Sequence, residues 1–146
     1  MTLKNDQITS HFSFPINKNE ISKAILANES NLRKIVNIVH LEVRKKMKIF
    51  LRKNKNKKIV ILDIPLLLEN NINKKNDILI FVQSKRSNIL KRLKKRKNFN
   101  KRLLTKFRNI QLPLDYKKKK SHFIIKNNFT KKSVTKDIKN ILKKIL

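Results

Sequence analysis

The sequence of 146 residues contains no glycine and no cysteine. A phosphate-binding loop of the form G-x-x-x-x-G-K-[ST] requires glycine, because its backbone N–H groups reach the phosphates in conformations that a side chain hinders. That loop and the glycine-rich turn that binds dinucleotides are therefore excluded within these residues. The absence of cysteine excludes disulfides, thiolate metal sites and thiol nucleophiles, and it is typical of proteins in a reducing cytoplasm.

Long uncharged hydrophobic runs are also missing. No run approaches the roughly 18 residues that a membrane span requires, and the N-terminal segment MTLKNDQITSHFSF has no apolar core of the kind found in secretory signals. We therefore expect a cytoplasmic protein without a membrane partner. The length is that of one domain with a sizeable core, and we expect residues 1–146 to form that domain.

Acidic residues are scarce: 9 Asp and Glu stand against 39 Lys and Arg, which gives a formal net charge of +30. Such an excess favours binding to nucleic acid. The abundance of Lys, Asn, Ile and Phe has a second explanation, because A/T-rich codons encode all four and a biased genome would make almost any protein basic. The sequence leaves both interpretations open, and we expect nucleic acid to be bound only non-specifically.

Two apolar runs, at residues 59–62 and 78–82, predict buried strands. Neither run alternates polar with apolar side chains, which is typical of a parallel sheet covered by helices on both faces. A further run at residues 122–126 predicts a short third strand. Because ligands of such sheets bind beyond the carboxyl ends of the strands, we expect the site at residues 63–69 and 83–86.

Helical spacing of apolar residues predicts two helices before the first strand. A short one at residues 18–26 precedes a long one, which starts at a cap residue, Asn28 or Ser30, and ends near Arg52. The predicted buried stripe of the long helix consists of Leu32, Ile35, Val36, Val39, Val43, Met47 and Phe50.

Further helices are predicted after the second strand, at residues 87–95 and 101–110, and a closing helix is predicted after a cap at Thr130 or Ser133. We expect residues 117–120, all lysine, to be a solvated face or a helix end. The order of elements predicts an α/β fold in which helices flank a three-layer parallel sheet.

Five short motifs follow one another along the chain. They are Ile16-Asn17-Lys18; Ile38-Val39-His40-Leu41-Glu42-Val43-Arg44; Asp63-Ile64-Pro65-Leu66-Leu67-Leu68-Glu69; the pair Arg92 and Arg96; and Gln111 and Lys117 with Phe123-Ile124-Ile125-Lys126-Asn127. Together they resemble the dephospho-coenzyme A kinase family, enzymes of the P-loop kinase fold that use ATP to phosphorylate the ribose 3′-hydroxyl of dephospho-CoA.

The chain departs from the family pattern at several positions. Leu41 stands where the family has proline, and Phe129 stands where glycine is common. The glycine-rich phosphate loop with which the family begins is not among these residues. The resemblance therefore implies a P-loop kinase-like α/β fold that is N-terminally truncated.

The resemblance implies a helical acceptor-binding part (residues 16–53), central strands (58–83), lid-like helices (84–120), and a last strand with the C-terminal helix (121–146). It implies ATP and dephospho-CoA as substrates and Mg²⁺ as a cofactor. The residues implied to bind the phosphates of ATP are Arg92, Arg96, Lys117 and Asn127. Those implied to bind the acceptor are His40, Asp63, Pro65, Leu66, Leu67 and Glu69. No catalytic base is assigned, and no cluster of His, Asp and Glu has metal-ligand spacing.

Several of these residues have a second interpretation. Arg92 and Arg96, four apart on a predicted helix face, suit binding to phosphate oxygens, but the lysines around them also fit a solvated basic face. Glu69 is equally suited to capping a helix N-terminus, and Asn127 to holding a turn. His40 is either a contact on the substrate side or a helix-packing residue.

The sequence supports three functions: the acceptor-binding and lid portion of a kinase, a basic RNA-binding module, and an inactive truncated gene product. Proteins that bind single strands place aromatic side chains among basic residues for stacking. Here Phe81, Phe107 and Phe123 fall at apolar positions of the predicted elements. This placement favours the kinase portion. Within it, the strand-end carboxylate of Asp63 is suited to ordering Mg²⁺ or a substrate hydroxyl.

Overall fold

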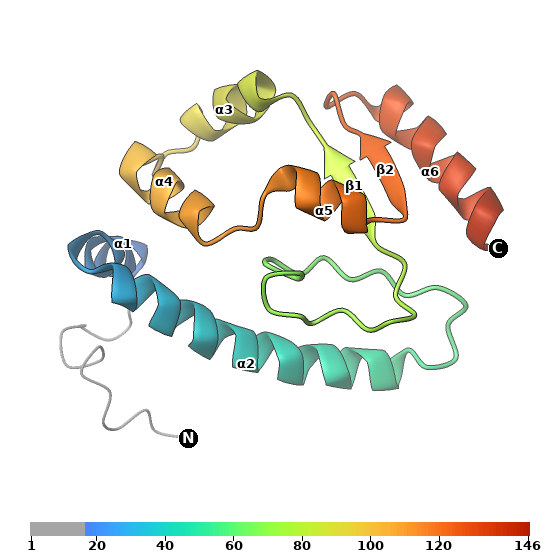
Figure 1. Cartoon of the computed structure of the whole chain (residues 1–146), viewed down its shortest axis with the longest axis horizontal. Coiled ribbons are helices and arrows are strands. Elements are labelled where there is room, and N and C mark those ends of the chain that lie inside the picture. The colour runs from blue at the N-terminus through green and yellow to red at the C-terminus, as the bar shows by residue number, and fades with distance from the viewer. Residues whose placement is uncertain (1–16) are drawn as a thin grey trace. The chain divides into compact units, whose positions relative to one another are not determined.

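A computed structural model describes residues 17–146 of the chain (Figure 1). They form two compact units: unit 1 contains residues 17–65 and Arg102–Arg108, and unit 2 contains Leu66–Lys101 and Asn109–Leu146. Ile16, the first residue of the predicted acceptor-binding part, lies outside the described residues. Within residues 17–146, no helix combines the length and the apolar composition that crossing a bilayer would require.

The first part of unit 1 contains two helices, α1 (Lys18–Ala27) and α2 (Glu29–Lys53), and Arg102–Arg108 adds most of a third helix. An asparagine side chain caps each N-terminus: Asn17 accepts two backbone N–H groups of the first turn of α1, and Asn28 accepts the N–H of Ser30. These N–H groups have no partner inside the helix, so the caps fix where the helices begin. Both predicted helices and the Asn28 cap are confirmed.

The core of unit 1 includes the contact between α1 and α2, where Ile25 and Leu32 are almost fully buried. At 10 residues, α1 is too short to cover the whole apolar stripe of α2, which has 25 residues. Val39 and Phe50, which were predicted to be buried, are exposed. The helical spacing of apolar residues thus located the apolar stripe of α2, but it could not show how much of that stripe is covered by another element.

The apolar run at residues 59–62 does not form the predicted strand. The run is irregular, and the side chain of Ile61 is 83% exposed. A strand requires a neighbour that pairs its backbone N–H and C=O groups, and among residues 17–146 none pairs with this run. The prediction of a buried strand here was wrong. Apolar residues indicate that a segment favours burial, but they do not show which other segment pairs with it or buries it.

Unit 2 contains two parallel strands, β1 (Ile80–Gln83) and β2 (Phe123–Lys126), as the sequence predicted. In their register Ile80 lies beside Phe123 and Gln83 beside Lys126. Helix α6 (Lys131–Ile145) runs alongside β2 (Figure 1). This small parallel sheet with helices is consistent with an α/β fold of the P-loop kinase type.

The contact between α6 and β2 forms the core of unit 2. Ile125 of β2 and Ile141 of α6 are buried. The carboxylate of Asp137 on α6 accepts the backbone N–H of Lys126 at 2.8 Å, which ties the helix to the end of the strand. Thr130 is the N-cap residue of α6 as predicted, although its side chain makes no capping hydrogen bond.

The other strand, β1, is largely exposed. The side chains of Ile80 and Val82 are 44% and 55% exposed. Among the described residues, β1 therefore does not have the helical cover on both faces that the sequence predicts. Ile80 and Val82 are exposed because α6 packs on β2, and no helix of the described residues packs on β1 to the same extent.

Three helices lie in the connection between the strands: α3 (Arg86–Lys94), α4 (Lys101–Asn109) and α5 (Leu114–Lys120). The first two confirm the predictions within two residues. The third was predicted only as a charge run or a helix end. The sequence held a signal for it, because an acidic residue in the first turn and four lysines in the last turn match the helix dipole.

Candidate functional site

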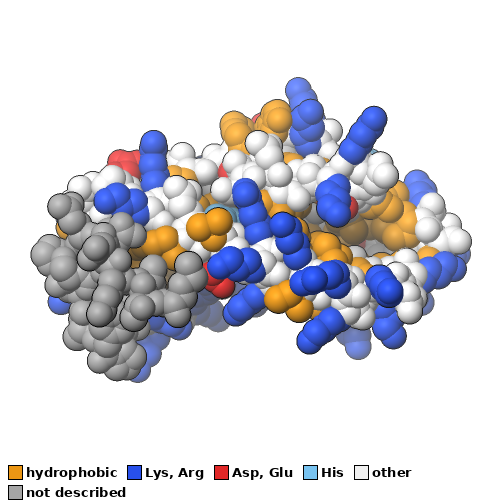
Figure 2. Space-filling model, turned by 90° about the horizontal axis from the view of Figure 1, so that it is seen from below, with side chains coloured by type: hydrophobic (Ala, Val, Ile, Leu, Met, Phe, Trp, Pro, Cys, Tyr) orange, Lys and Arg blue, Asp and Glu red, His pale blue; other side chains and the backbone are white. Residues whose placement is uncertain are grey.

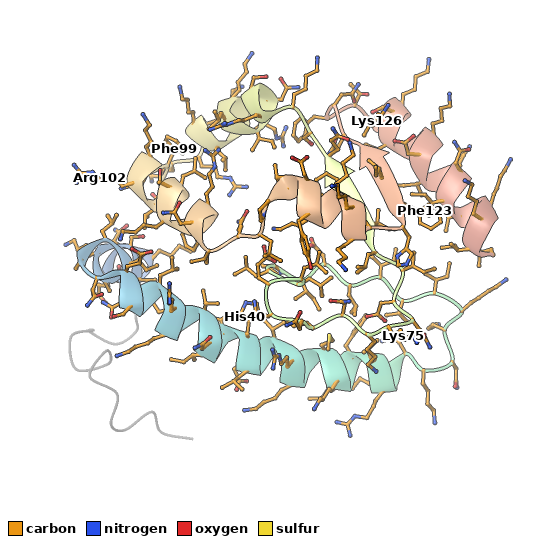
Figure 3. The ribbon with its side chains drawn as sticks, viewed as in Figure 1. His40, Lys75, Phe99, Arg102, Phe123 and Lys126 are labelled. Carbon is orange, nitrogen blue, oxygen red and sulfur yellow. The ribbon has the colours of Figure 1, made fainter. Side chains whose placement is uncertain are left out.

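The carboxyl ends of β1 and β2 meet at one edge of the sheet. Just beyond β2, the backbone N–H of Asn127 donates to the C=O of Gln83 at 2.8 Å and so continues the pairing. From this edge the chain enters α3 after β1 and a tight turn after β2. Phe123 and Lys126 mark the two ends of β2 in Figure 3. This edge is where ligands of parallel sheets bind.

The turn at residues 127–130 is held by its own side chains. The side-chain oxygen of Asn127 accepts the N–H of Phe129 at 2.8 Å, and that of Asn128 accepts the N–H of Thr130 at 3.0 Å. The Asn128 oxygen also accepts the hydroxyl groups of Thr130 and Ser133, at 2.7 and 2.5 Å. Asn127 therefore does hold a turn, which was one of its two predicted roles.

Phe129 occupies the left-handed region of backbone space, with a φ of 66°. This conformation costs a residue with a side chain about 1–2 kcal/mol, whereas glycine adopts it readily. The geometry gives a physical reason why glycine is common at this position in the family that the sequence resembles. The sequence analysis noted Phe129 only as a departure and missed its contact with Arg92; the turn-forming Asn127-Asn128 pair before it was the available signal.

Arg92 lies over the ring of Phe129, with its guanidinium carbon 4.5 Å from the ring centroid. The distance is that of a cation–π contact. It brings together α3 and the turn after β2, two segments that are far apart in the sequence. The structure thus places one predicted phosphate ligand, Arg92, next to the turn that contains a second, Asn127.

Arg96 does not share the helix face of Arg92, because α3 ends at Lys94. The N–H groups of Lys95 and Arg96 donate to the C=O groups three residues back, at 3.2 and 3.0 Å, which closes the helix with a tighter turn. The basic run around this point has no acidic residue to offset its repulsion. The prediction of one arginine face was wrong for this reason, and Arg96 lies in an exposed turn.

Glu69 and Lys117 form an ion pair with 2.5 Å between the carboxylate oxygen and Nζ, and their side chains are 10% and 19% exposed. The same carboxylate accepts the backbone N–H of Leu112 at 3.0 Å. Glu69 therefore joins the segment before α5 to α5 itself. The sequence assigned Glu69 to the acceptor and Lys117 to phosphate, and it did not foresee that the two residues pair with each other.

Burial of Glu69 acts to raise the pKa of its carboxyl group. The hydrogen bond from Lys117 and the backbone N–H groups of Glu69 and Leu112 outweigh this effect, so the pKa lies below its ordinary value of 4.5. The carboxylate is therefore favoured in the folded protein. Its contribution to stability is fully present above pH 4.5 and is lost as the pH falls through the lower pKa of the folded state.

The lowered pKa of Glu69 predicts how stability should change at acid pH. Between about pH 6 and about pH 3 the free energy of unfolding of the wild-type chain should fall more than that of Glu69→Gln, because the variant has no proton to gain at this position. Urea unfolding monitored by circular dichroism at each pH measures both values. Parallel curves for the two proteins would show that the ion pair contributes nothing that depends on the carboxylate charge.

Residues 65–71 form a compact turn, and the backbone of Leu66 near its beginning is strained. Leu66 has a φ of 55°, a left-handed conformation that is costly for a bulky residue. Its C=O accepts both the backbone N–H and the side-chain N–H of Asn70, at 3.1 and 2.9 Å. Leu66 and Leu67 are half-buried.

The remaining predicted acceptor residues, His40, Asp63 and Pro65, belong to unit 1. His40 extends from the middle of α2 (Figure 3) and is 6% exposed, which fits its predicted role as a packing residue. Asp63 and Pro65 are exposed. Within residues 17–146, no three His, Asp or Glu side chains gather in a group that could hold a metal ion.

Figure 2 shows lysine and arginine side chains projecting into solvent from the described residues, with hydrophobic side chains exposed between them. A shallow hollow of about 190 Å³ is lined by Phe123, Ile124, Asp137, Asn140, Ile141 and Lys144 of β2 and α6. It contains none of the predicted site residues, so the sheet edge is the better candidate for the site.

Residues 9–133 match the family model of dephospho-CoA kinase. Relatives with this name from Wolbachia sp. subsp. Brugia malayi and Wolbachia pipientis wMel are 33% and 32% identical to the chain over 129 residues. Each alignment covers 87% of the chain and 66% of the relative, so the chain spans slightly less than two thirds of their length. A relative from Fusobacterium nucleatum is 28% identical over 130 residues, 89% of this chain and 67% of its own. With most of its length matched, the chain belongs to the dephospho-CoA kinase family.

Proposed function

We propose that this chain carries the acceptor-binding and lid parts of a dephospho-CoA kinase, which uses ATP to phosphorylate the ribose 3′-hydroxyl of dephospho-CoA. The observation that carries the proposal is the family match over residues 9–133. The arrangement in unit 2 supports it, because α3 brings Arg92 to the turn that follows β2. Positive charge at that edge suits the phosphates of a nucleotide.

We also propose that β1 and β2 are part of a three-layer sheet of the P-loop kinase type. The exposed side chains of Ile80 and Val82 support this, because apolar residues of parallel strands are normally covered on both faces. The proposal includes a cytoplasmic location. It also includes only non-specific contact with nucleic acid, which the excess of 39 Lys and Arg over 9 Asp and Glu supports.

Arg92 is the residue that we assign to the phosphates of ATP. A planar guanidinium donates two parallel N–H bonds to phosphate oxygens and offsets the negative charge of the group that is transferred. Arg96 is proposed to add charge from the exposed turn after α3. Lys117 is engaged by Glu69, so in this proposal it mainly holds α5 in place, and any contact with phosphate competes with the ion pair.

On the acceptor side, we propose that Leu66 and Leu67, which follow Pro65 directly in the sequence, form an apolar wall. We assign His40, on α2, to the acceptor as well. Mg²⁺ in kinases is held by one or two carboxylates together with substrate phosphates. Asp63, exposed after the apolar run of residues 59–62, fits such a role as a single protein ligand. When bound, the ion offsets negative charge on the phosphates.

Titration of ATP and dephospho-CoA into the purified chain, at low and at high salt, tests the proposal. We expect saturable binding of both that persists in high salt. Arg92→Ala should weaken ATP binding about tenfold or more, because a charge-assisted bidentate contact is lost. Lys91→Ala is the matched control: it removes one positive charge from the neighbouring position of α3 and should change affinity little.

Two results would contradict the proposal. One is binding to a short RNA alone, with an affinity that disappears in high salt, which is the behaviour of a non-specific nucleic-acid binder. The other is an equal effect of Arg92→Ala and Lys91→Ala on ATP affinity, which would mean that general charge and not a phosphate contact is responsible. Turnover by these 146 residues alone is not required, because they contain no glycine-rich phosphate loop.

A further inference from the structure

The contact between Arg92 and Phe129 raises the question of what holds Arg92 in place before a ligand binds. Helix α3 has 9 residues, and none of them is buried. Its N-cap residue, Lys85, makes no capping hydrogen bond through its side chain. The helix is therefore weakly anchored by its own packing, and an arginine on it would ordinarily sample many rotamers.

Phe129, in contrast, is fixed independently of Arg92. The N–H of Phe129 is bound by Asn127, and the next residue is bound by Asn128 through its N–H and its hydroxyl group. These bonds hold Phe129 at its left-handed φ of 66°. The ring is thereby presented at the carboxyl edge of the sheet, and it remains 40% exposed.

Stacking on a ring and binding to phosphate use different parts of a guanidinium group. The ring contacts the flat face of the cation, whereas all five N–H donors lie in its plane. Arg92 can therefore keep its contact with Phe129 while its edge donates to phosphate oxygens. An arginine that is already ordered loses less entropy when it binds, so affinity rises without a new contact to the ligand.

We propose that Phe129 is a positioning residue, which holds the guanidinium of Arg92 over the sheet edge in readiness for the phosphates of a nucleotide. The inference rests on the proposed function and deepens it. A glycine at this position would relieve the backbone strain but would offer no ring. The strained conformation of Phe129 is thus the cost of keeping Arg92 ordered.

Inorganic tripolyphosphate is the probe that tests this role, because it presents phosphates without a base or a ribose. Phe129→Leu keeps the apolar bulk and the backbone strain but removes the ring, and it should weaken tripolyphosphate binding about three- to tenfold. Phe129→Tyr keeps the ring and should bind as the wild type does. Phe107→Leu is the control, since Phe107 is equally exposed, at 40%, but lies on α4 in unit 1.

Two further measurements separate positioning from a merely structural role. In the wild-type chain without ligand, the side-chain protons of Arg92 should show an upfield ring-current shift in NMR spectra, and Phe129→Leu should abolish it. Arg92→Ala should also weaken binding, and the double variant Arg92→Ala/Phe129→Leu should be no weaker than Arg92→Ala alone, because Phe129 acts only through Arg92.

Unchanged tripolyphosphate affinity in Phe129→Leu, or additive losses in the double variant, would overturn the role of Phe129 and leave the proposed function standing. Failure of the wild-type chain to bind tripolyphosphate at all would overturn both. If Phe129→Leu does not fold, Phe129→Gly serves in its place: it relieves the strain, and the same loss of affinity is expected from it.

Discussion

Replacing Leu41 by proline is expected to lower the free energy of unfolding by about 3 kcal/mol or more, which makes it one of the two largest effects we predict. Leu41 lies in the interior of α2, which runs without a break from Glu29 to Lys53. Proline there would lack the N–H that bonds to the C=O of Asn37, and its ring would clash with that carbonyl. Urea unfolding followed by circular dichroism measures the loss.

The matched control is Leu41→Ala. The side chain of Leu41 is 59% exposed, and alanine is a strong helix former, so this variant should stay within about 0.5 kcal/mol of the wild type. The comparison has a bearing on the family, because Leu41 occupies a position where the pattern that the chain resembles has proline. If Leu41→Pro proved as stable as Leu41→Ala, the continuous helix would be wrong and a turn at His40 would be favoured.

Glu69→Ala is expected to cost about 2–3 kcal/mol of stability. The substitution leaves the half-buried ammonium of Lys117 without its anion and the N–H of Leu112 without its acceptor. Glu69→Gln should cost less, because an amide oxygen can still accept the N–H of Leu112. Denaturant unfolding of each variant measures these differences.

A double-mutant cycle assigns the effect to the pair. Lys117→Met removes the cation, and Glu69→Ala/Lys117→Met removes both charges. If the two residues act together, the double variant should be clearly more stable than the sum of the two single losses predicts. Lys118→Met is the control, since it removes a lysine from the same helix that lies next to the ion pair in sequence but is not part of it. Strict additivity would refute the coupling.

Local patterns predicted the helices well, because a helix satisfies its backbone groups within its own segment. The Asn28 cap, the apolar spacing of α1 and α2, and the helices α3, α4 and α6 all followed from neighbours in the sequence. The helix missed, α5, has only seven residues, too few to show an apolar period, and only its charge distribution indicated it.

The strands were harder to predict, because a strand depends on a partner that the local sequence does not name. The run at residues 59–62 is as apolar as β1, yet only β1 finds a parallel neighbour among residues 17–146. The predicted site residues divide in the same way. The family pattern selected Arg92, Asn127, Glu69 and Lys117, but the contacts that these residues make could not be predicted from it.

Spacing along the chain was enough to locate five of the six helices among residues 17–146, the apolar runs and the residues that carry the family pattern. The pairing of Glu69 with Lys117 and the contact of Phe129 with Arg92 became visible only in the folded chain. Glu69 and Lys117 are 48 residues apart in the sequence, and Arg92 and Phe129 are 37 apart. Which distant side chains meet is set by packing of whole elements against one another, and that is a property of the folded chain.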